Sequence, residues 1–167
     1  MKNLTPSILD FEASGFGAQS YPIEVGVVRS DGKKFCSLIR PFDDWIHWDE
    51  HAQSLHGISR SHLLSYGRPG IEVCQQLNEL LQGETAYSDG WVVDSPWMTK
   101  LFARAGVSPS FRLSALEYVL NERQMADWRI TKEQVLSSRQ ESRHRASSDA
   151  EVIQQTYMMT AGLTLRA

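Results

Sequence analysis

Two carboxylates, Asp10 and Glu12, interrupt an apolar stretch near the start of this 167-residue chain. The surrounding residues predict a short buried strand over residues 4–12. Because side chains alternate along a strand, both acids point to one face, with Cα atoms roughly 6.6 Å apart. Two such acids repel each other and resist desolvation unless a positive charge lies between them. The pair therefore predicts a binding site for a cation.

Two further acids and a histidine lie near the starts of predicted helices. Asp94 follows a loop and begins a helix predicted over 94–105, and helix capping explains it equally well. Asp149 lies on the edge of the apolar stripe of a helix near the end of the chain, where an unpaired carboxylate is costly, although a first-turn acid is the simpler alternative. His144 lies five residues earlier, and five helical residues turn through about 500°. We therefore expect His144 on the loop that leads into this helix.

Together, these four carboxylates and the histidine are candidates for a single site. An all-carboxylate cluster suits hard, oxygen-preferring cations such as Mg²⁺ or Mn²⁺ better than zinc. Two ions about 4 Å apart can clamp a phosphodiester, one acidifying a water and the other stabilising the leaving oxygen. A histidine with a near-neutral pKa can accept the proton of that water. The combination predicts metal-assisted phosphodiester hydrolysis.

The elements that must position these residues begin with three predicted strands. Residues 4–12, 21–28 and 33–40 are apolar and β-favouring, and Ser30-Asp31-Gly32 is a strong hairpin signal. They predict an antiparallel meander, followed by alternating helices and strands in one α/β domain over 1–167. The later strands are expected at 85–88 and 111–113. Helices are expected at 59–64, 70–81, 94–105 and 114–121, and after capping boxes at Thr131 and Ser148, whereas 41–54 is expected to be irregular.

Composition narrows the function classes further. The formal charge of −3 argues against coating long nucleic acid by bulk charge. No apolar run approaches the roughly 18 residues that span a bilayer, and no signal peptide is recognisable. Cys36 and Cys74 lie in apolar surroundings and are expected to be buried and reduced, so we expect a cytoplasmic protein without membrane contact.

The sequence resembles the DEDDh 3′-to-5′ exonucleases, which include the proofreading subunit of bacterial replicative polymerase, RNase T and oligoribonuclease-like enzymes. The segments that match the three Exo motifs are residues 10–12 (DFE), Asp94 with Trp97-Met98 after it, and residues 144–149 (HRASSD). Residues 22–26 (PIEVG) and 55–58 (LHGI) add to a similarity that spans roughly 7–157.

The resemblance implies an RNase H-like fold, in which the three-strand meander and two parallel strands form a mixed five-stranded sheet flanked by helices. It implies two-metal hydrolysis at the 3′ end of single-stranded DNA or RNA, releasing nucleoside 5′-monophosphates. Asp10, Glu12 and Asp149 would hold one Mg²⁺ or Mn²⁺ ion and Asp10 would also touch the second. Asp94 would bind through water, and His144 would be the general base.

The resemblance also implies residues that bind substrate. The segment after the first motif would line the terminal nucleotide, with Phe16 stacking on its base or else packing in the core. The arginines beside His144 are suited to grip phosphates, or they form a solvated helix end. We expect at most one tryptophan to stack on a base, among Trp45, Trp48 and Trp91. The substrate-binding candidates are Ala13, Ser14, Gly15, Phe16, His56, Arg143 and Arg145.

The chain departs from the family in two places. Relatives often have Asn-x-x-Phe-Asp in the second motif, whereas this chain has residues 90–94 (GWVVD), with Asp89 as a competing acid. Ala13 replaces a common Thr. One alternative is a catalytically silent nucleic-acid-binding or protein-docking module with the same fold. Another alternative is purely structural, with the acids serving as helix caps. DNA against RNA, homodimer formation and association with a polymerase stay open at this level.

Overall fold

The computed structural model describes residues 5–139 and 144–162 and contains a mixed five-stranded sheet in the order β3-β2-β1-β4-β5. β1 pairs antiparallel with β2 and parallel with β4, β2 pairs antiparallel with β3, and β4 pairs parallel with β5. This sheet confirms the predicted α/β fold class. The strands are β1 (Ser7–Ala13), β2 (Pro22–Val28), β3 (Lys34–Leu38), β4 (Thr85–Ser88) and β5 (Arg112–Ala115).

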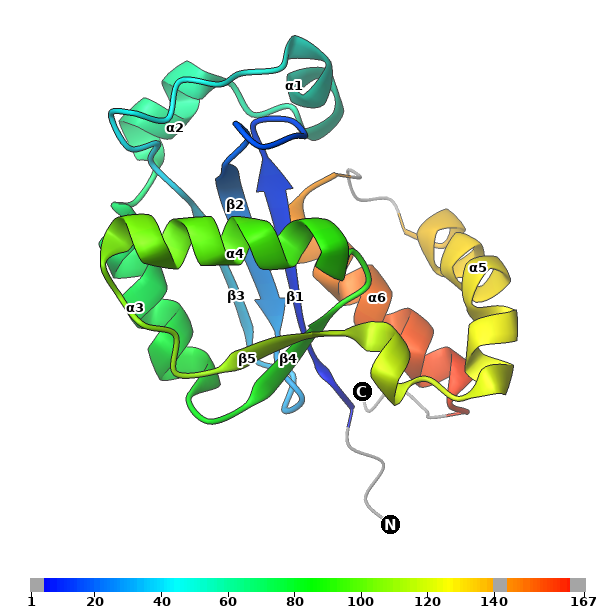
Figure 1. Cartoon of the computed structure of the whole chain (residues 1–167). Helices are drawn as coiled ribbons and strands as arrows, with labels where there is room; N and C mark the ends of the chain where they lie inside the picture. The colour runs from blue at the N-terminus through cyan, green and yellow to red at the C-terminus, as the bar shows by residue number, and fades with distance from the viewer. Residues whose placement is uncertain (1–4, 140–143, 163–167) are drawn as a thin grey trace.

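Helices cover both faces of the sheet. In Figure 1, α4 lies in front of the strands and α6 behind them, with α5 packed beside α6. The helices are α1 (Glu50–His56), α2 (Arg60–Tyr66), α3 (Gly70–Leu81), α4 (Trp91–Ala105), α5 (Glu122–Ser137) and α6 (Ala146–Thr160), with a 3₁₀ helix η1 (Leu116–Val119) after β5.

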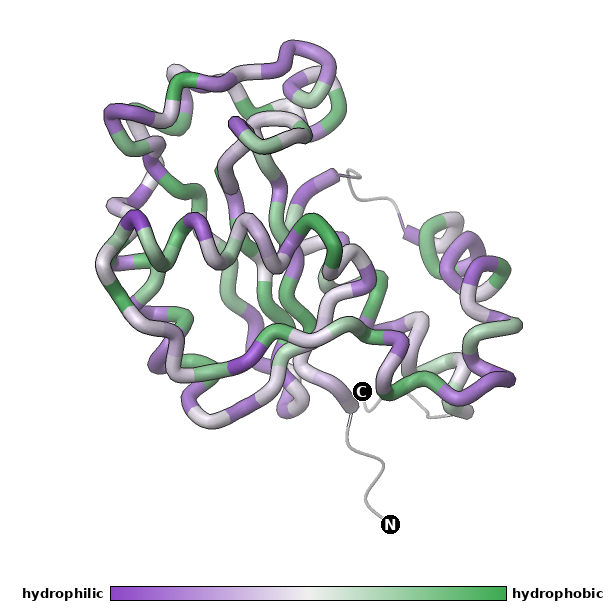
Figure 2. Tube along the Cα trace, viewed as in Figure 1, coloured by the Kyte–Doolittle hydropathy of each residue, from purple (hydrophilic) through white to green (hydrophobic). Residues whose placement is uncertain are grey.

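Strand alternation separates the core from the site. Leu9 and Phe11 point into the larger apolar cluster with residues of α3 and α4, whereas Ile8 packs against Ala150 and Ile153 of α6. Figure 2 shows hydrophobic segments in the central strands and mixed polarity along α5. Asp10 and Glu12 therefore share the α6 face of β1.

The sequence missed α1, most of which lies within the stretch 41–54 that was expected to be irregular. Asp49 caps this helix, because its carboxylate accepts hydrogen bonds from the backbone of His51 and Ala52 at 2.8 and 3.4 Å. The helix expected over 114–121 is wrong, since β5 extends to Ala115 and only the short η1 follows.

Several predicted helix starts also need correction. α4 begins at Trp91, so Asp94 lies within its first turn rather than at the boundary. α5 begins at Glu122 after a capping box between Asn121 and Gln124, and Thr131 lies inside it. α6 begins at Ala146 rather than after Ser148.

The two cysteines differ in exposure. Cys74 is buried as predicted, but Cys36 lies on β3 with its side chain exposed, so that prediction is wrong. Across the described ranges, no helix has the length and apolar character that a bilayer crossing needs.

Candidate active site

Three of the predicted acids converge where α6 packs on β1. Asp10 and Glu12 come from the second half of β1, and Asp149 comes from the first turn of α6. One carboxylate oxygen from each lies within 4.8 Å of the others, and all three side chains are half-buried. Such a group of oxygens matches the ligands that Mg²⁺ and Mn²⁺ prefer.

The pKa values of these three acids are all raised, mainly by burial and by repulsion between the carboxylates. Burial, and then repulsion from Asp94 and Asp149, raises the pKa of Asp10 well above its usual value. Burial and the charge of Asp149 raise the pKa of Glu12 to about 8. Burial also raises the pKa of Asp149, although the nearby His144 opposes this shift. Because a bound cation would favour the ionised form of all three acids, the residues present fit a divalent metal.

Asp94 lies beside this trio and is almost completely buried. Its carboxylate accepts a hydrogen bond from the Ser88 hydroxyl, and the hydroxyl oxygen accepts the Gly90 N–H at 2.9 Å. Burial raises the pKa of Asp94 to about 7, while the Ser88 hydrogen bond opposes the shift. Asp94 is not among the three acids within 4.8 Å of one another, but its charge acts directly on Asp10.

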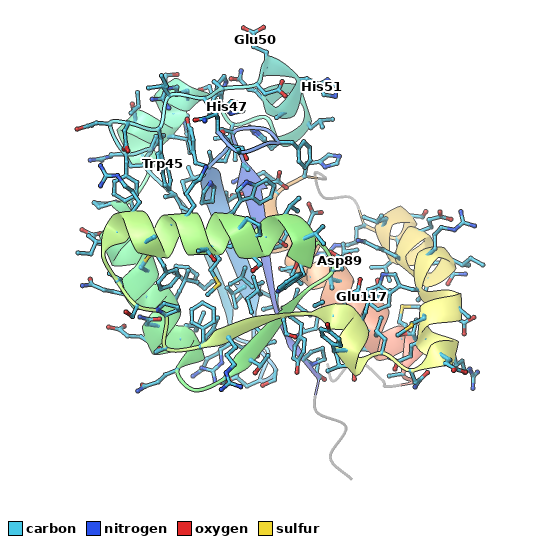
Figure 3. The ribbon with its side chains drawn as sticks, viewed as in Figure 1. Trp45, His47, Glu50, His51, Asp89 and Glu117 are labelled. Atoms are coloured by element: carbon cyan, nitrogen blue, oxygen red, sulfur yellow. The ribbon has the colours of Figure 1, made fainter. Side chains whose placement is uncertain are left out.

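Asp89 and Lys132 are a neighbouring ion pair that joins the β4–α4 loop to α5. Figure 3 shows Asp89 at the start of α4, on the side that faces α5. The charge of Asp89 raises the pKa values of Asp10, Asp94 and Asp149, and Lys132 lowers that of Asp149. The sequence identified Asp89 only as a competitor of Asp94. It missed Lys132, which has no local signal.

His144 lies directly before α6, on the loop where it was expected. Its backbone φ is 62°, a left-handed conformation that is uncommon outside glycine. The effect of His144 on the pKa of Asp149 shows that the ring lies near the acids. Arg145 forms an ion pair with Glu24 of β2, with Nη2 2.6 Å from Oε1. Arg143 lies outside the described residues.

The segment after Glu12 forms a fixed turn. The Ser14 hydroxyl lies 2.9 Å from His47 Nδ1 and accepts the Tyr21 N–H at 3.1 Å. Ala13 and Gly15 are buried. Gly15 has a φ of 149°, and a Cβ there would lie 2.7 Å from His47 Cε1. Only glycine fits this close approach.

Phe16 projects from that turn and is 71% exposed, so the core alternative is wrong. Its ring lies 6.1 Å from the ring of Trp97 on α4. The turn is held from α4, because Lys100 Nζ donates to the carbonyls of Ala18 and Ser20, and Trp97 Nε1 donates to the Ser20 hydroxyl at 2.9 Å. The exposed ring is thus mounted on an anchored loop.

His56, at the end of α1, is buried with an incomplete set of hydrogen bonds. Nδ1 accepts the Ile58 N–H at 3.1 Å, so the ring proton is on Nε2. Nε2 has no hydrogen-bond partner among the described residues. Burial lowers the pKa of His56, while the charge of Glu24 and the nearby backbone of Ala13 oppose that shift. A buried donor without a partner is costly unless a ligand satisfies it.

The tryptophans differ as candidate base platforms. Trp45 is buried and stacks on Tyr21 at 5.0 Å between ring centroids. Trp48 is half-buried and donates from Nε1 to Gln53 at 2.8 Å. Trp91 is 41% exposed, and its Nε1 donates to the Leu113 carbonyl. Burial therefore removes Trp45 from the candidates.

Comparison with known proteins gives matches in structure alone. No family model and no curated protein sequence matches the chain. A structure of exonuclease I matches with a TM-score of 0.74 and 14% identity, covering 95% of this chain and 41% of that chain. Product-bound exonuclease I matches with a TM-score of 0.70 and 14% identity, covering 95% and 44%. E. coli exonuclease I with a dA16 oligonucleotide matches with a TM-score of 0.68 and 14% identity, covering 93% and 41%.

These matches confirm the predicted RNase H-like fold, which this chain shares with exonuclease I. The chain spans about two fifths of the length of these exonuclease I chains.

Proposed function

We propose that the chain is a DEDDh-type, metal-dependent exonuclease that hydrolyses single-stranded DNA from the 3′ end. The observation that supports this proposal most directly is the close approach of Asp10, Glu12 and Asp149, with ligand atoms within 4.8 Å. Single-stranded DNA is the favoured substrate because neighbours of the same fold were solved with dA16 and dT13 oligonucleotides.

The carboxylates supply the metal site. Asp10, Glu12 and Asp149 would hold a divalent cation, and Asp94 would contribute to a second one next to Asp10. When bound, such cations acidify a water and neutralise the charge that develops on the phosphodiester. The Ser88 hydrogen bond fixes the carboxylate of Asp94. The ion pair with Lys132 keeps Asp89 partly neutralised beside the site.

The other residues position the substrate and move the proton. The ring of His144, close to Asp149, would accept the proton of the attacking water. Phe16 would stack on the terminal base, because every base offers an apolar face to an aromatic ring. The buried Nε2–H of His56, which makes no geometric hydrogen bond among the described residues, would donate to the terminal nucleotide. Arg145 is held by Glu24, which makes it a poorer phosphate ligand than a free arginine.

The proposed function is tested with oligonucleotides labelled at the 3′ or the 5′ end, incubated with Mg²⁺ or Mn²⁺. We expect immediate release of a labelled mononucleotide from the 3′-labelled strand and a ladder of shortening fragments from the 5′-labelled strand. Single-stranded DNA should be degraded faster than the matching RNA. Release of mononucleotides from the 5′ end, or binding of DNA without cleavage, would contradict the proposed activity.

Replacing Phe16 with alanine tests the proposed base platform. A base–aromatic stack contributes roughly 1–3 kcal/mol, so we expect KM to rise about 5- to 150-fold with a smaller change in kcat. Tyr66 has the same exposed fraction of 71% on α2, which makes Tyr66→Ala the matched control. Equal KM values for both variants would rule out stacking by Phe16.

A further inference from the structure

A buried carboxylate on β2 has no part in the chemistry described so far. Glu24 is 2% exposed and lies directly opposite Glu12 in the β1–β2 register. Its charge adds to the repulsion that raises the pKa of Glu12. A buried, ionised carboxylate beside other carboxylates destabilises the folded state unless hydrogen-bond donors or cations neutralise its charge.

The partners of Glu24 come from the segment that carries His144 and Asp149. Arg145 donates from Nε to both carboxylate oxygens, at 3.0 and 3.1 Å, and from Nη2 to Oε1 at 2.6 Å. The Ala146 N–H donates to Oε2 at 3.0 Å. The N-cap residue of α6, Arg145, makes no side-chain capping bond of its own. Glu24 therefore supplies, from the sheet, the anion that the start of this helix needs.

Gly26 completes the contact two residues further along β2. A Cβ at this position would lie 2.3 Å from the carbonyl carbon of Ala146 and 2.4 Å from the nitrogen of Ser147. Both obstacles are backbone atoms, which cannot swing away as a flexible side chain can. The start of α6 thus packs directly against the β2 backbone, and only glycine leaves enough space for this contact.

The register explains why this contact matters for the site. Gly26 pairs with Asp10 and Glu24 with Glu12, so the start of α6 is fixed beside the two acids of β1. Asp149 follows one helical turn later, with its N–H bonded to the Arg145 carbonyl at 2.9 Å. His144 precedes Arg145 with its left-handed backbone. Fixing residues 145 and 146 therefore also fixes the positions of His144 and Asp149.

We propose that Glu24 and Gly26, here named the β2 seat, are positioning residues that set the place of His144 and Asp149 relative to Asp10 and Glu12. Arg145 is the tether to this seat rather than a phosphate ligand. The inference rests on the proposed function for its effect on turnover, but its structural content is independent of activity. It also gives a physical role to the PIEVG segment at 22–26.

Glu24→Gln and Arg145→Met test the seat through kinetics. A misplacement of about 1 Å can cost roughly 100-fold, so we expect each variant to lower kcat at least about tenfold with little change in KM. The double variant should be no worse than the poorer single variant, because both break one contact. A rise in KM at constant kcat for Arg145→Met, with unchanged kcat for Glu24→Gln, would overturn the proposal in favour of phosphate binding.

Two readouts that need no activity separate this proposal from the proposed function. In Glu24→Gln, we expect the amides of Ala146 to Asp149 to exchange with solvent at least about tenfold faster, and Mn²⁺ to bind correspondingly more weakly. Unchanged exchange in these amides would overturn the seat whatever the activity. If the wild type cleaves no oligonucleotide but exchange and Mn²⁺ binding respond as expected, the seat stands and the nuclease proposal fails.

The chain offers a matched control in Glu84, which forms a partly buried ion pair with Arg29 at 2.8 Å. Glu84 also accepts a hydrogen bond from Ser7, at the start of β1 and away from the acids. Glu84→Gln should reduce the melting temperature as Glu24→Gln does, while kcat and exchange at 146–149 stay at wild-type values. If Glu24→Gln does not fold, Arg145→Met and Arg145→Lys, at a half-exposed position, decide the question. Arg145→Lys keeps the positive charge but loses the guanidinium group that binds both carboxylate oxygens of Glu24. Its kcat should therefore lie between those of Arg145→Met and the wild type.

Discussion

Replacing Asp10 with asparagine is expected to abolish most of the proposed exonuclease activity. Asp10 is close to Glu12 and Asp149, and the charge of Asp94 acts on it, so it would contribute to both proposed ion positions. Its loss would weaken the site where the charge of the reaction develops. Losing one such electrostatic contact costs roughly 10²- to 10³-fold in turnover, and we expect at least this decrease in kcat. Initial rates on 3′-labelled single-stranded DNA give the effect, and calorimetric titration should show weaker Mn²⁺ binding.

Asp31→Asn is the control for this experiment, because it makes the same chemical change in the β2–β3 turn. The Asp31 side chain is 42% exposed and accepts the Lys33 N–H at 3.1 Å. It lies in the turn after Val28, at the end of β2 opposite to Glu24. Its activity should match the wild type. Wild-type turnover by Asp10→Asn would mean that any cleavage observed arises elsewhere, and the assignment of the active site would be wrong.

Removing divalent metal should make the stability of the protein depend strongly on pH. The pKa of Glu12 rises from 4.5 to about 8 on folding, and that of Asp94 from 3.8 to about 7. A raised pKa means that the folded state binds protons more tightly than the unfolded chain. The stability from this proton binding is fully present below the unfolded pKa and is lost as pH rises through the folded pKa. In EDTA, the melting temperature should therefore fall from about pH 4.5 to about pH 8.

Mn²⁺ should reverse this loss at the alkaline end, since the ionised site binds the cation and binding stabilises the folded state. Glu12→Gln removes one of the repelling charges. We expect this variant to melt higher than the wild type near pH 8 in EDTA and to gain less from Mn²⁺. A wild-type melting temperature that is flat or rises over this pH range in EDTA would contradict an unneutralised carboxylate cluster.

Much of the fold follows from local signals. The alternating apolar residues and the Ser30-Asp31-Gly32 turn predict the meander, and the spacing of Val73, Leu77 and Leu81 predicts α3. α5 was misplaced because it buries little. Only Gln124 and Val135 of this helix are buried, so no continuous apolar stripe marks its start, and its capping box lies ten residues before the predicted one.

The candidate site also has a part that local sequence signals predict and a part that they do not. The types and order of Asp10, Glu12, Asp94 and Asp149 can be identified from the sequence because the three motifs are short and local. Contacts such as Lys132 with Asp89 or Arg145 with Glu24 join residues that are far apart in the chain. These contacts depend on how α5 and α6 pack against the sheet, and the spacing of residues in the sequence does not determine that packing.

The packing of α6 against β1 also bears on how the protein is made. The Asp10–Glu12 pair leaves the ribosome early, whereas its third partner, Asp149, is synthesised only after the rest of the sheet. Contacts between such distant segments form late, because the loop between them must first be ordered. A nascent chain that lacks α6 therefore has an incomplete metal site. The proposed cleavage activity would therefore require a chain in which α6 has been synthesised and packed against β1.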